Sequence, residues 1–258
     1  GEQDTLKVHL RQGASLEGTP EHPVAIMNES GQIEFREISK LKVGDLVAIK
    51  YNTQCFGSLK EINTEKAYLM GLLTGDGNLS HSSRVGFTTT DNELALAFSS
   101  YIKENYPETN VYMASDKITH TASSWKIKKD LYESGMSYLL SYDKIIPPFI
   151  MMSPKEVIIA FLQGLFDTDG YFERYTVGYA TVSKTLSDQV LAMLLNLGIV
   201  AKRRIKSSAS ESRPRPVYEI MISGTSLQVF ALQIGFRLRR KQMKLEEYLS
   251  THAIGNTN

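Results

Sequence analysis

The chain has 258 residues, of which 42% are hydrophobic, 22% charged and 9% aromatic. This composition is typical of a soluble globular chain with a sizeable core, and it excludes fibrous proteins and extensive disorder. The 29 Lys and Arg residues nearly balance the 28 Asp and Glu residues, so a net charge of +1 does not by itself indicate a polyanion as partner.

The same composition bears on location. No apolar run approaches the roughly 20 residues needed to cross a bilayer, so we expect neither a membrane span nor a membrane partner. Glu2, Asp4 and Lys7 lie where a secretory signal would need an apolar core. The single cysteine, Cys55, excludes an internal disulfide framework and suits a reducing compartment. We expect an intracellular protein, cytoplasmic or nucleoid-associated.

The first 55 residues have the pattern of a small all-β segment. Short apolar stretches alternate with turn signals such as Glu17-Gly18 and Gly44-Asp45. The stretches cover residues 6–10, 23–27, 33–35 and 46–49. After Asn52 the pattern changes to longer helical segments with strands between them. We therefore predict a domain boundary close to residue 55.

The rest of the chain contains an internal duplication. Residues 68–77 reappear as residues 161–170, at an offset of 93. A short strand follows each copy, at residues 84–89 and 176–181, and an amphipathic helix follows each strand, at residues 92–105 and 184–197. The repeat predicts an α+β fold in which two units, residues 56–150 and 151–258, are related by a pseudo-twofold axis.

Further strands are predicted at residues 110–113, 125–127, 199–205 and 217–222. The last two form a hairpin whose long loop is the basic, Ser-rich tract 206–216. That composition predicts a loop that becomes ordered only on a partner.

Each repeated helix ends in Asp-Gly. Gly71 and Gly75 share one helix face, as do Gly164 and Thr168 in the second copy, so the two faces can pack closely. Asp76 and Asp169 would then emerge side by side at the same end of the pair.

Two carboxylates at helix C-termini oppose the helix dipoles and repel each other. A divalent ion such as Mg2+, which uses one or two carboxylates together with water and substrate phosphate, would relieve this strain. An isolated Asp-Gly is usually an ordinary turn, but two in matching frames favour a functional role. Asp167 has Thr74 as its counterpart, so we interpret it as a helix or supporting residue.

The two nonapeptides, Leu69–Gly77 and Leu162–Gly170, resemble the LAGLIDADG homing endonucleases of the two-motif, monomeric, intein-encoded type. They keep five and six of the nine name-giving residues. The resemblance implies tandem αββαββα units, whose saddle-shaped sheets bind the DNA major groove. Residues 143–150 resemble the Lys-x-Ile-Pro segment of that family, which makes Lys144 the candidate active-site lysine. Residues 234–241 resemble the second such segment and indicate Lys241, with Lys244 or Arg240 as alternatives.

The first segment resembles the splicing domain of inteins. Residues 18–24 contain its Thr-x-x-His block, here Thr19 and His22, and residues 41–48 resemble its later Gly-Asp strand. The chain starts at Gly1 without a Cys or Ser nucleophile segment, and it ends in Gly-Asn-Thr-Asn rather than His-Asn. We therefore expect Thr19 and His22 to be remnants of a Hint-like segment that does not splice, and His22 could equally be a loop histidine.

These observations predict a site-specific endonuclease that hydrolyses both strands of a long, non-palindromic DNA site with Mg2+ or another divalent cation such as Mn2+. Asp76 and Asp169 would hold the metal, and Lys144 and Lys241 would stabilise phosphoryl charge. The alternative hypotheses are a regulator or RNA-splicing cofactor that keeps the fold without cleavage, and a peptide-processing remnant centred on the first segment.

Basic residues on or beside predicted strands are the candidates for DNA contact. They are Arg84, Lys117, Lys126, Arg174, Lys202, Arg204, Arg213 and Arg215. A second basic cluster spans residues 237–244, and the two clusters together weakly favour a polyanion partner. Each of these residues could equally be a solvated surface charge.

Overall fold

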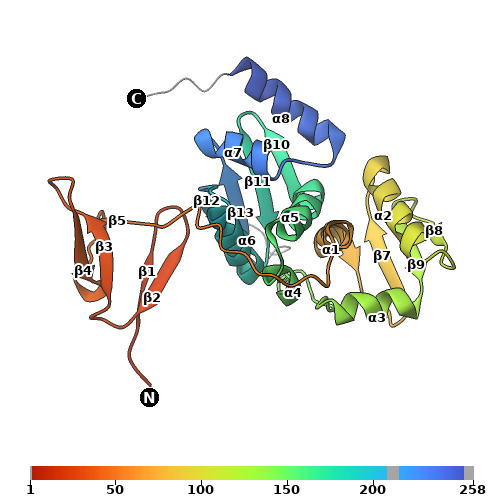
Figure 1. Ribbon diagram of the computed structural model, residues 1–258, viewed down its shortest axis with the longest axis horizontal. Coiled ribbons are helices and arrows are strands. Elements are labelled where there is room, and N and C mark those ends of the chain that lie inside the picture. The colour runs from red at the N-terminus through yellow and green to blue at the C-terminus, as the bar shows by residue number, and fades with distance from the viewer. Residues whose placement is uncertain (1, 208–214, 253–258) are drawn as a thin grey trace.

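A computed structural model describes residues 2–207 and 215–252 of the chain (Figure 1). Its first part is a small β unit. Strands β1 (Leu6–His9) and β2 (Ser15–Gly18) form a hairpin, and β3 (Pro23–Met27), β4 (Ile33–Glu37) and β5 (Leu46–Val47) form a sheet of order β4-β3-β5, with the short helix η1 (Ile38–Lys40) after β4. Val24, Ile26 and Ile38 form a small core of their own, separate from the core of the remaining chain.

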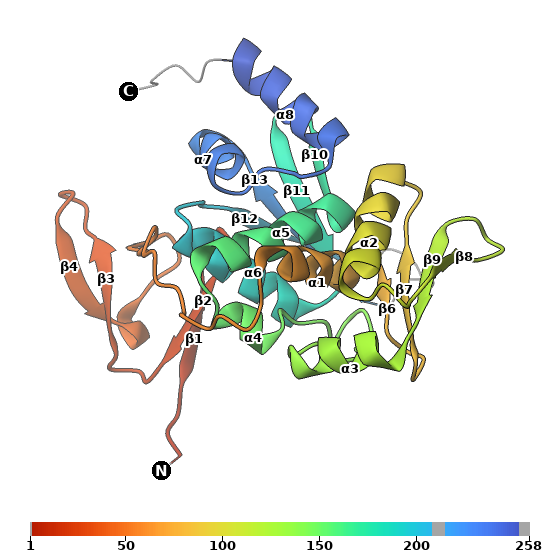
Figure 2. The ribbon, with the colours of Figure 1, turned by 45° about the vertical axis from the view of Figure 1, so that its right-hand side comes forward.

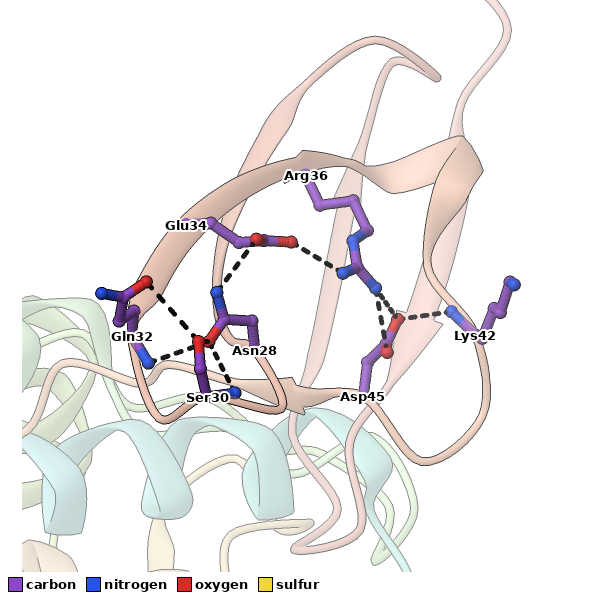
Figure 3. A network of polar contacts seen from close by, with 7 residues as sticks. All are labelled: Asn28, Ser30, Gln32, Glu34, Arg36, Lys42 and Asp45. Carbon is purple, nitrogen blue, oxygen red and sulfur yellow. Dashed lines mark hydrogen bonds and ion pairs between the residues drawn. The ribbon is translucent and has the colours of Figure 1, made fainter.

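Polar side chains stabilise the turns of this β unit (Figure 3). Arg36 donates to Glu34 at 2.7 Å and to both carboxylate oxygens of Asp45 at 3.1 Å. In the β3–β4 turn, the Asn28 side chain accepts from the backbone N–H groups of Ser30 and Gln32. These bonds add to the limited apolar burial of so small a core.

The segment after β5 lies across the second repeated unit before the chain enters the first one (Figures 1 and 2). The Asn52 N–H donates to the Leu195 carbonyl at 2.8 Å, and the Asn196 side chain bonds the N–H and the carbonyl of Cys55. The Leu59 N–H donates to the Met152 carbonyl at 3.0 Å. Hydrogen bonds from the backbone and from the Asn196 side chain therefore bind this connection to the second unit at residues 52, 55 and 59.

The remaining chain folds as two copies of one unit. The first contains α1 (Thr64–Asp76), β6 (Gly77–Asn78), β7 (Arg84–Thr88), α2 (Asn92–Asn105), β8 (Val111–Met113), β9 (Thr119–Ser123) and α3 (Trp125–Glu133). The second contains α5 (Lys155–Asp169), β10 (Gly170–Glu173), β11 (Thr176–Thr181), α6 (Lys184–Asn196), β12 (Lys202–Lys206), β13 (Val217–Ile222) and α7 (Thr225–Gln233). The sheets have equivalent orders, β6-β7-β9-β8 and β10-β11-β13-β12. The predicted α+β fold with tandem αββαββα units is confirmed. Helix α4 (Pro148–Met151) lies in the connection between the units, and α8 (Arg239–Thr251) follows the second.

The strand predicted at residues 125–127 is wrong, because this segment begins helix α3. Ser124 caps the helix by accepting from the Ile127 N–H, and the buried Ile127 and Leu131 are one helical turn apart. The strand predicted at residues 199–205 begins only at Lys202. The predicted hairpin of β12 and β13 is confirmed by their antiparallel register, whereas residues 208–214 of its loop lie outside the described part of the chain.

Helices α1 and α5 pack face to face at the centre of the two units, as the glycine pattern predicted (Figure 2). A Cβ on Gly71 would overlap the Phe161 carbonyl oxygen, and a Cβ on Gly164 would overlap the Tyr68 carbonyl oxygen. One turn further on, a Cβ on Gly75 would overlap the Thr168 hydroxyl. Only glycine permits this backbone separation, and it brings the C-terminal ends of both helices together.

Candidate active site

Asp76 and Asp169 are the last residues of α1 and α5, and each is followed by a glycine that begins the first strand of its unit. The ends of the helices are so close that a Cβ on Gly75 would lie 3.3 Å from Oδ2 of Asp169. Asp76 is exposed and Asp169 is half-buried. The last turn of neither helix carries a basic residue. The two acids therefore emerge together where both helix dipoles are negative.

The electrostatics of the two carboxyl groups reflect this placement. Burial, and secondarily the charge of Asp76, raises the pKa of Asp169 to about 6. Desolvation by the surrounding protein also raises the pKa of Asp76, although its side chain reaches solvent. Lys144 and Lys241 oppose both shifts. The pair is thus incompletely neutralised by the protein, which favours a bound cation.

One lysine approaches the end of each helix. Nζ of Lys144 donates to the Gly75 carbonyl at 2.5 Å, and burial lowers its pKa against the raising effect of Asp169 and Asp76. Nζ of Lys241 is buried and donates to the carbonyls of residues 166, 167, 168 and 170. Burial lowers the pKa of Lys241 to about 8. Gly75 and Thr168 are equivalent positions in the repeat, so each lysine binds the carbonyl that precedes an acid.

Asp167 supports the second lysine segment. Its Oδ2 accepts from the Tyr68 hydroxyl at 2.8 Å and from the backbone N–H groups of Arg237 and Leu238. Burial raises the pKa of Asp167 to about 6, although the bond from Tyr68 lowers it. Tyr68 was not among the residues predicted from sequence. The signal available there was the difference between Tyr68 and its repeat counterpart Phe161.

Cavities flank the acid pair. A cavity of about 250 Å³ is lined by Asp76, Asp167, Thr168 and Arg240, and one of about 270 Å³ is lined by Lys241, Lys244 and Glu173. A third, of about 370 Å³, lies beside Lys144. Cavities are thus lined by Asp76 and by both lysines, whereas Asp169 is half-buried.

Among residues 2–207 and 215–252, no group of three or more His, Cys, Asp and Glu side chains could hold a metal ion. The donors present are two carboxylates with raised pKa values and access to solvent or a cavity. This set fits a hydrated Mg2+ or Mn2+, which takes most of its oxygen ligands from water and substrate phosphate. It does not fit an ion that needs a complete protein cage.

The strand register defines the face of each sheet that points away from the helices, here called the open face. Val85 and Phe87, and Val177 and Tyr179 in the second unit, point into the core. Since paired residues share a face, the first open face carries Arg84, Thr88, Thr119, Thr121 and Ser123. The second open face carries Lys202, Arg204, Lys206, Glu219 and Met221. The structure therefore brings the predicted contacts Arg84, Lys202 and Arg204 onto open faces.

The other predicted DNA-contact residues are distributed differently. Lys117 and Arg174 are exposed in the β8–β9 and β10–β11 turns, with φ values of 62° and 59°. The Arg215 guanidinium lies 3.4 Å from the centroid of the Tyr142 ring. Lys126 belongs to α3, which packs on the helical side of the first sheet, so it does not lie with the open-face residues. Arg213 lies outside the described residues.

Part of the second basic cluster is engaged within the protein, and its interpretation as a polyanion contact stays a prediction. Arg237 pairs with Glu65 and Arg240 with Asp91, while Lys241 is buried. In the N-terminal β unit, Thr19 and His22 lie in the turn between β2 and β3, where the His22 N–H donates to the Thr19 carbonyl. Their assignment to a splicing-block remnant stays a prediction.

The arrangement defines a mixed α+β LAGLIDADG fold, and comparisons with known proteins agree. Residues 156–235 match the model of the family described as LAGLIDADG-like domain. Solved structures of the homing endonuclease I-DmoI superpose on 73% of this chain and 100% of theirs, at 20% identity, with TM-scores of 0.54 for mesophilic variants and 0.53 for a complex with DNA and Ca.

Curated relatives match nearly the whole chain. The replication factor C small subunit of Methanocaldococcus jannaschii is 28% identical over 95% of this chain, and that of Thermococcus kodakarensis is 28% identical over 92%. The chain spans only 13% and 26% of the lengths of these two relatives. None of the described helices combines the length and apolarity required to span a bilayer.

Proposed function

We propose that the chain is a divalent-metal-dependent, site-specific endonuclease that cleaves both strands of double-stranded DNA. The observation that carries the proposal is the packing of α1 on α5, which delivers Asp76 and Asp169 to one place with a lysine beside each helix end. I-DmoI, which has the same fold, was solved with its target DNA, and this supports DNA as the substrate.

Each residue has a chemical role in this proposal. Asp76 and Asp169 would bind Mg2+ or Mn2+, and when bound the ion lowers the pKa of water and stabilises a leaving oxygen. Lys144 and Lys241 would place positive charge beside the scissile phosphates and stabilise the negative charge that grows during hydrolysis. The proposed reaction does not require either acid to act as a nucleophile.

The sheets would supply binding. Lys202, Arg204 and Arg84 would contact phosphates or base edges from the open faces, with Lys117 and Arg174 at the hairpin tips. Because the two faces carry different side chains, the proposed site is non-palindromic. Since both motifs are in one chain, we propose that a monomer suffices.

The test uses a supercoiled plasmid library with randomised inserts, incubated with the protein and Mg2+ or Mn2+. Linear products are captured by adaptor ligation and sequenced. We expect linearisation at one recurrent sequence and no product in EDTA. The variant carrying Asp76→Asn and Asp169→Asn together should bind the recovered site and leave it intact.

Two results would contradict the proposal. Cleavage that survives in the double variant would remove the acids from the chemistry. Selective DNA binding by the parent, with no cutting under any metal condition, would favour the regulator or RNA-splicing cofactor. A loss of cleavage together with a loss of folding, seen by circular dichroism, would identify a damaged variant, and Asp4→Asn, at an exposed position of the N-terminal β unit, provides a surface control.

A further inference from the structure

Two short segments contain the candidate lysines: residues 144–146 contain Lys144 and residues 239–241 contain Lys241. Each of these lysine-bearing segments is bound by the N-terminal end of a helix. Helices α2 and α6 are equivalent in the repeat, and their N-cap residues are Asp91 and Ser183. Each of these side chains caps its own helix and also binds a lysine-bearing segment. Neither residue has a role in the proposed chemistry.

On the Lys144 side, the anchor comes from the second unit. Ser183 is fully buried, accepts from the Leu186 N–H at 3.1 Å and donates from its hydroxyl to the Lys144 carbonyl at 2.7 Å. Two residues along, the Ile146 N–H donates to the Gln189 side chain of the same helix at 2.8 Å. The ammonium of Lys144, however, reaches back to Gly75 in the first unit.

On the Lys241 side, the anchor comes from the first unit. Oδ1 of Asp91 caps α2, while its Oδ2 accepts from Nε of Arg240 at 2.7 Å. Helix α8 has no side-chain cap of its own, and the Glu93 carboxylate of α2 accepts the Arg239 N–H instead. A carboxylate at this position also complements the dipole of α8. The ammonium of Lys241 binds carbonyls of α5 in the second unit.

The two anchors are therefore exchanged between the units. Each lysine donates to carbonyls at the helix end of its own unit, but its segment is bound by the N-cap residue of the other unit. We propose that Ser183 and Asp91 are positioning residues that place Lys144 and Lys241, respectively, and that they couple the docking of the two units to completion of both halves of the site. The proposal rests on the endonuclease function proposed above. Because a displacement of about 1 Å can cost about 100-fold in rate, loss of one anchor should impair one strand selectively.

The first experiment measures cleavage of each strand separately, with the recovered site labelled on one strand at a time. Ser183→Ala should slow cutting of one strand about tenfold, so that nicked DNA accumulates. Asp91→Asn, which keeps a capping oxygen but loses the ion pair, should slow the opposite strand. Ser183→Thr, which keeps the hydroxyl, should restore parental behaviour. Ser124→Ala removes the cap of α3, which contacts neither lysine, and should leave both strands as in the parent.

The second experiment does not depend on cleavage. Lysines of the folded protein are acetylated with limiting reagent, and the extent at each site is read by mass spectrometry. Ser183→Ala should raise labelling of Lys144 relative to Lys241, and Asp91→Asn should do the reverse. If the parent cuts no DNA, the endonuclease proposal fails, and this labelling pattern still decides whether the anchors position the lysines.

Equal slowing of both strands, or slowing of the same strand by both variants, would show that the caps serve only general stability. Unchanged relative labelling in Ser183→Ala and Asp91→Asn would overturn the exchanged positioning, whatever the cleavage data show.

Discussion

The two sheets share one topology but present different chemistry on their open faces. The first carries mainly hydroxyl groups, from Thr88, Thr119 and Thr121, with Arg84 as a charged residue, whereas the second carries the charged side chains of Lys202, Arg204, Lys206 and Glu219. On the central strands the core-facing positions are apolar in both units, with Val85 and Phe87 in β7 and Val177 and Tyr179 in β11, because they pack on equivalent helices. Duplication therefore preserved the residues that determine the fold and left the open faces to diverge.

The two lysine sites differ in a similar way. Lys144 donates to one carbonyl, whereas the buried Lys241 donates to four. Asp167 anchors the segment before Lys241, while its counterpart Thr74 bonds only the Met70 carbonyl of its own helix. The second half of the site is therefore the more enclosed, although the repeat that generates both halves is the same.

The largest expected effect is the loss of cleavage when either acid is replaced. Asp76→Asn and Asp169→Asn should each reduce cleavage at least about 100-fold, because each would lose half of the metal ligand set. Their stabilities should differ. The folded-state pKa of Asp169, about 6, lies above its ordinary 3.8, so the free energy of unfolding falls as pH rises through this window.

Asp169→Asn should therefore raise the free energy of unfolding at pH 7, in EDTA, by on the order of 1–2 kcal/mol, and the gain should vanish below about pH 4. Asp76→Asn should gain less, because Asp76 is exposed. Urea denaturation at both pH values measures this difference. A larger gain for Asp76 would show that the first half is the more enclosed.

Alanine at three glycines should give graded losses of stability. Gly71→Ala forces a methyl into the backbone of α5 and should cost about 3 kcal/mol. Gly178→Ala displaces the Tyr171 ring and its bond to Glu219, at about 1–2 kcal/mol. Gly86, its counterpart in the first sheet, has only an ordinary 3.4 Å contact, and Gly86→Ala should change stability by less than about 0.5 kcal/mol.

Chemical denaturation of the three variants tests this order. Equal effects at Gly86 and Gly178 would mean that the Tyr171 ring does not restrict Gly178 as the contact indicates. A small effect at Gly71 would mean that α1 and α5 can separate without cost, which would also remove the basis for the acid pair.

The pH dependence of cleavage should report the protonation of the acid pair and of Lys241. The rate should rise through about pH 6 as the acid pair ionises, and fall above about pH 8 as Lys241 loses its proton. The free energy of unfolding should not fall together with the cleavage rate above about pH 8. The folded-state pKa of Lys241 lies below its ordinary 10.5, so its contribution to the free energy of unfolding rises with pH between about pH 8 and 10.5.

The measurement is initial cleavage rate and unfolding free energy on one set of buffers. Lys244→Gln should keep the alkaline limb, because Lys244 donates to none of the carbonyls that bind Lys241. Loss of that limb in Lys244→Gln would transfer the role to the alternative lysine.

Much of the fold could be predicted from sequence, because its signals are local. The bounds of α2 and of β11 and β13 follow from periodicity and turn residues alone, and the face-to-face helices follow from Gly71 and Gly164. Strand β9 was missed because it is a run of polar residues with only Ala122 buried.

The candidate site was only partly predictable. The acids and lysines lie within recognisable segments, but the bond from Tyr68 to Asp167 and the pair of Arg240 and Asp91 join residues 99 and 149 positions apart. Their side chains look like ordinary surface or core residues in the sequence. Only the docking of the two units brings them together.

The smallest expected effects distinguish the open faces by their dependence on salt. Arg204→Ala should weaken DNA binding at all sequences and reduce the slope of log affinity against log salt concentration by about 1, because one phosphate contact is lost. Thr121→Ala in the first sheet should leave the slope unchanged and alter affinity only for particular sequences. Fluorescence anisotropy over a salt series measures both slopes. Lys126→Ala, on the helical side of the first sheet, should leave slope and affinity as in the parent, since its charge lies away from both open faces. A reduced slope for Lys126→Ala, or an unchanged one for Arg204→Ala, would mean that DNA contacts a different surface from the one the strand register defines.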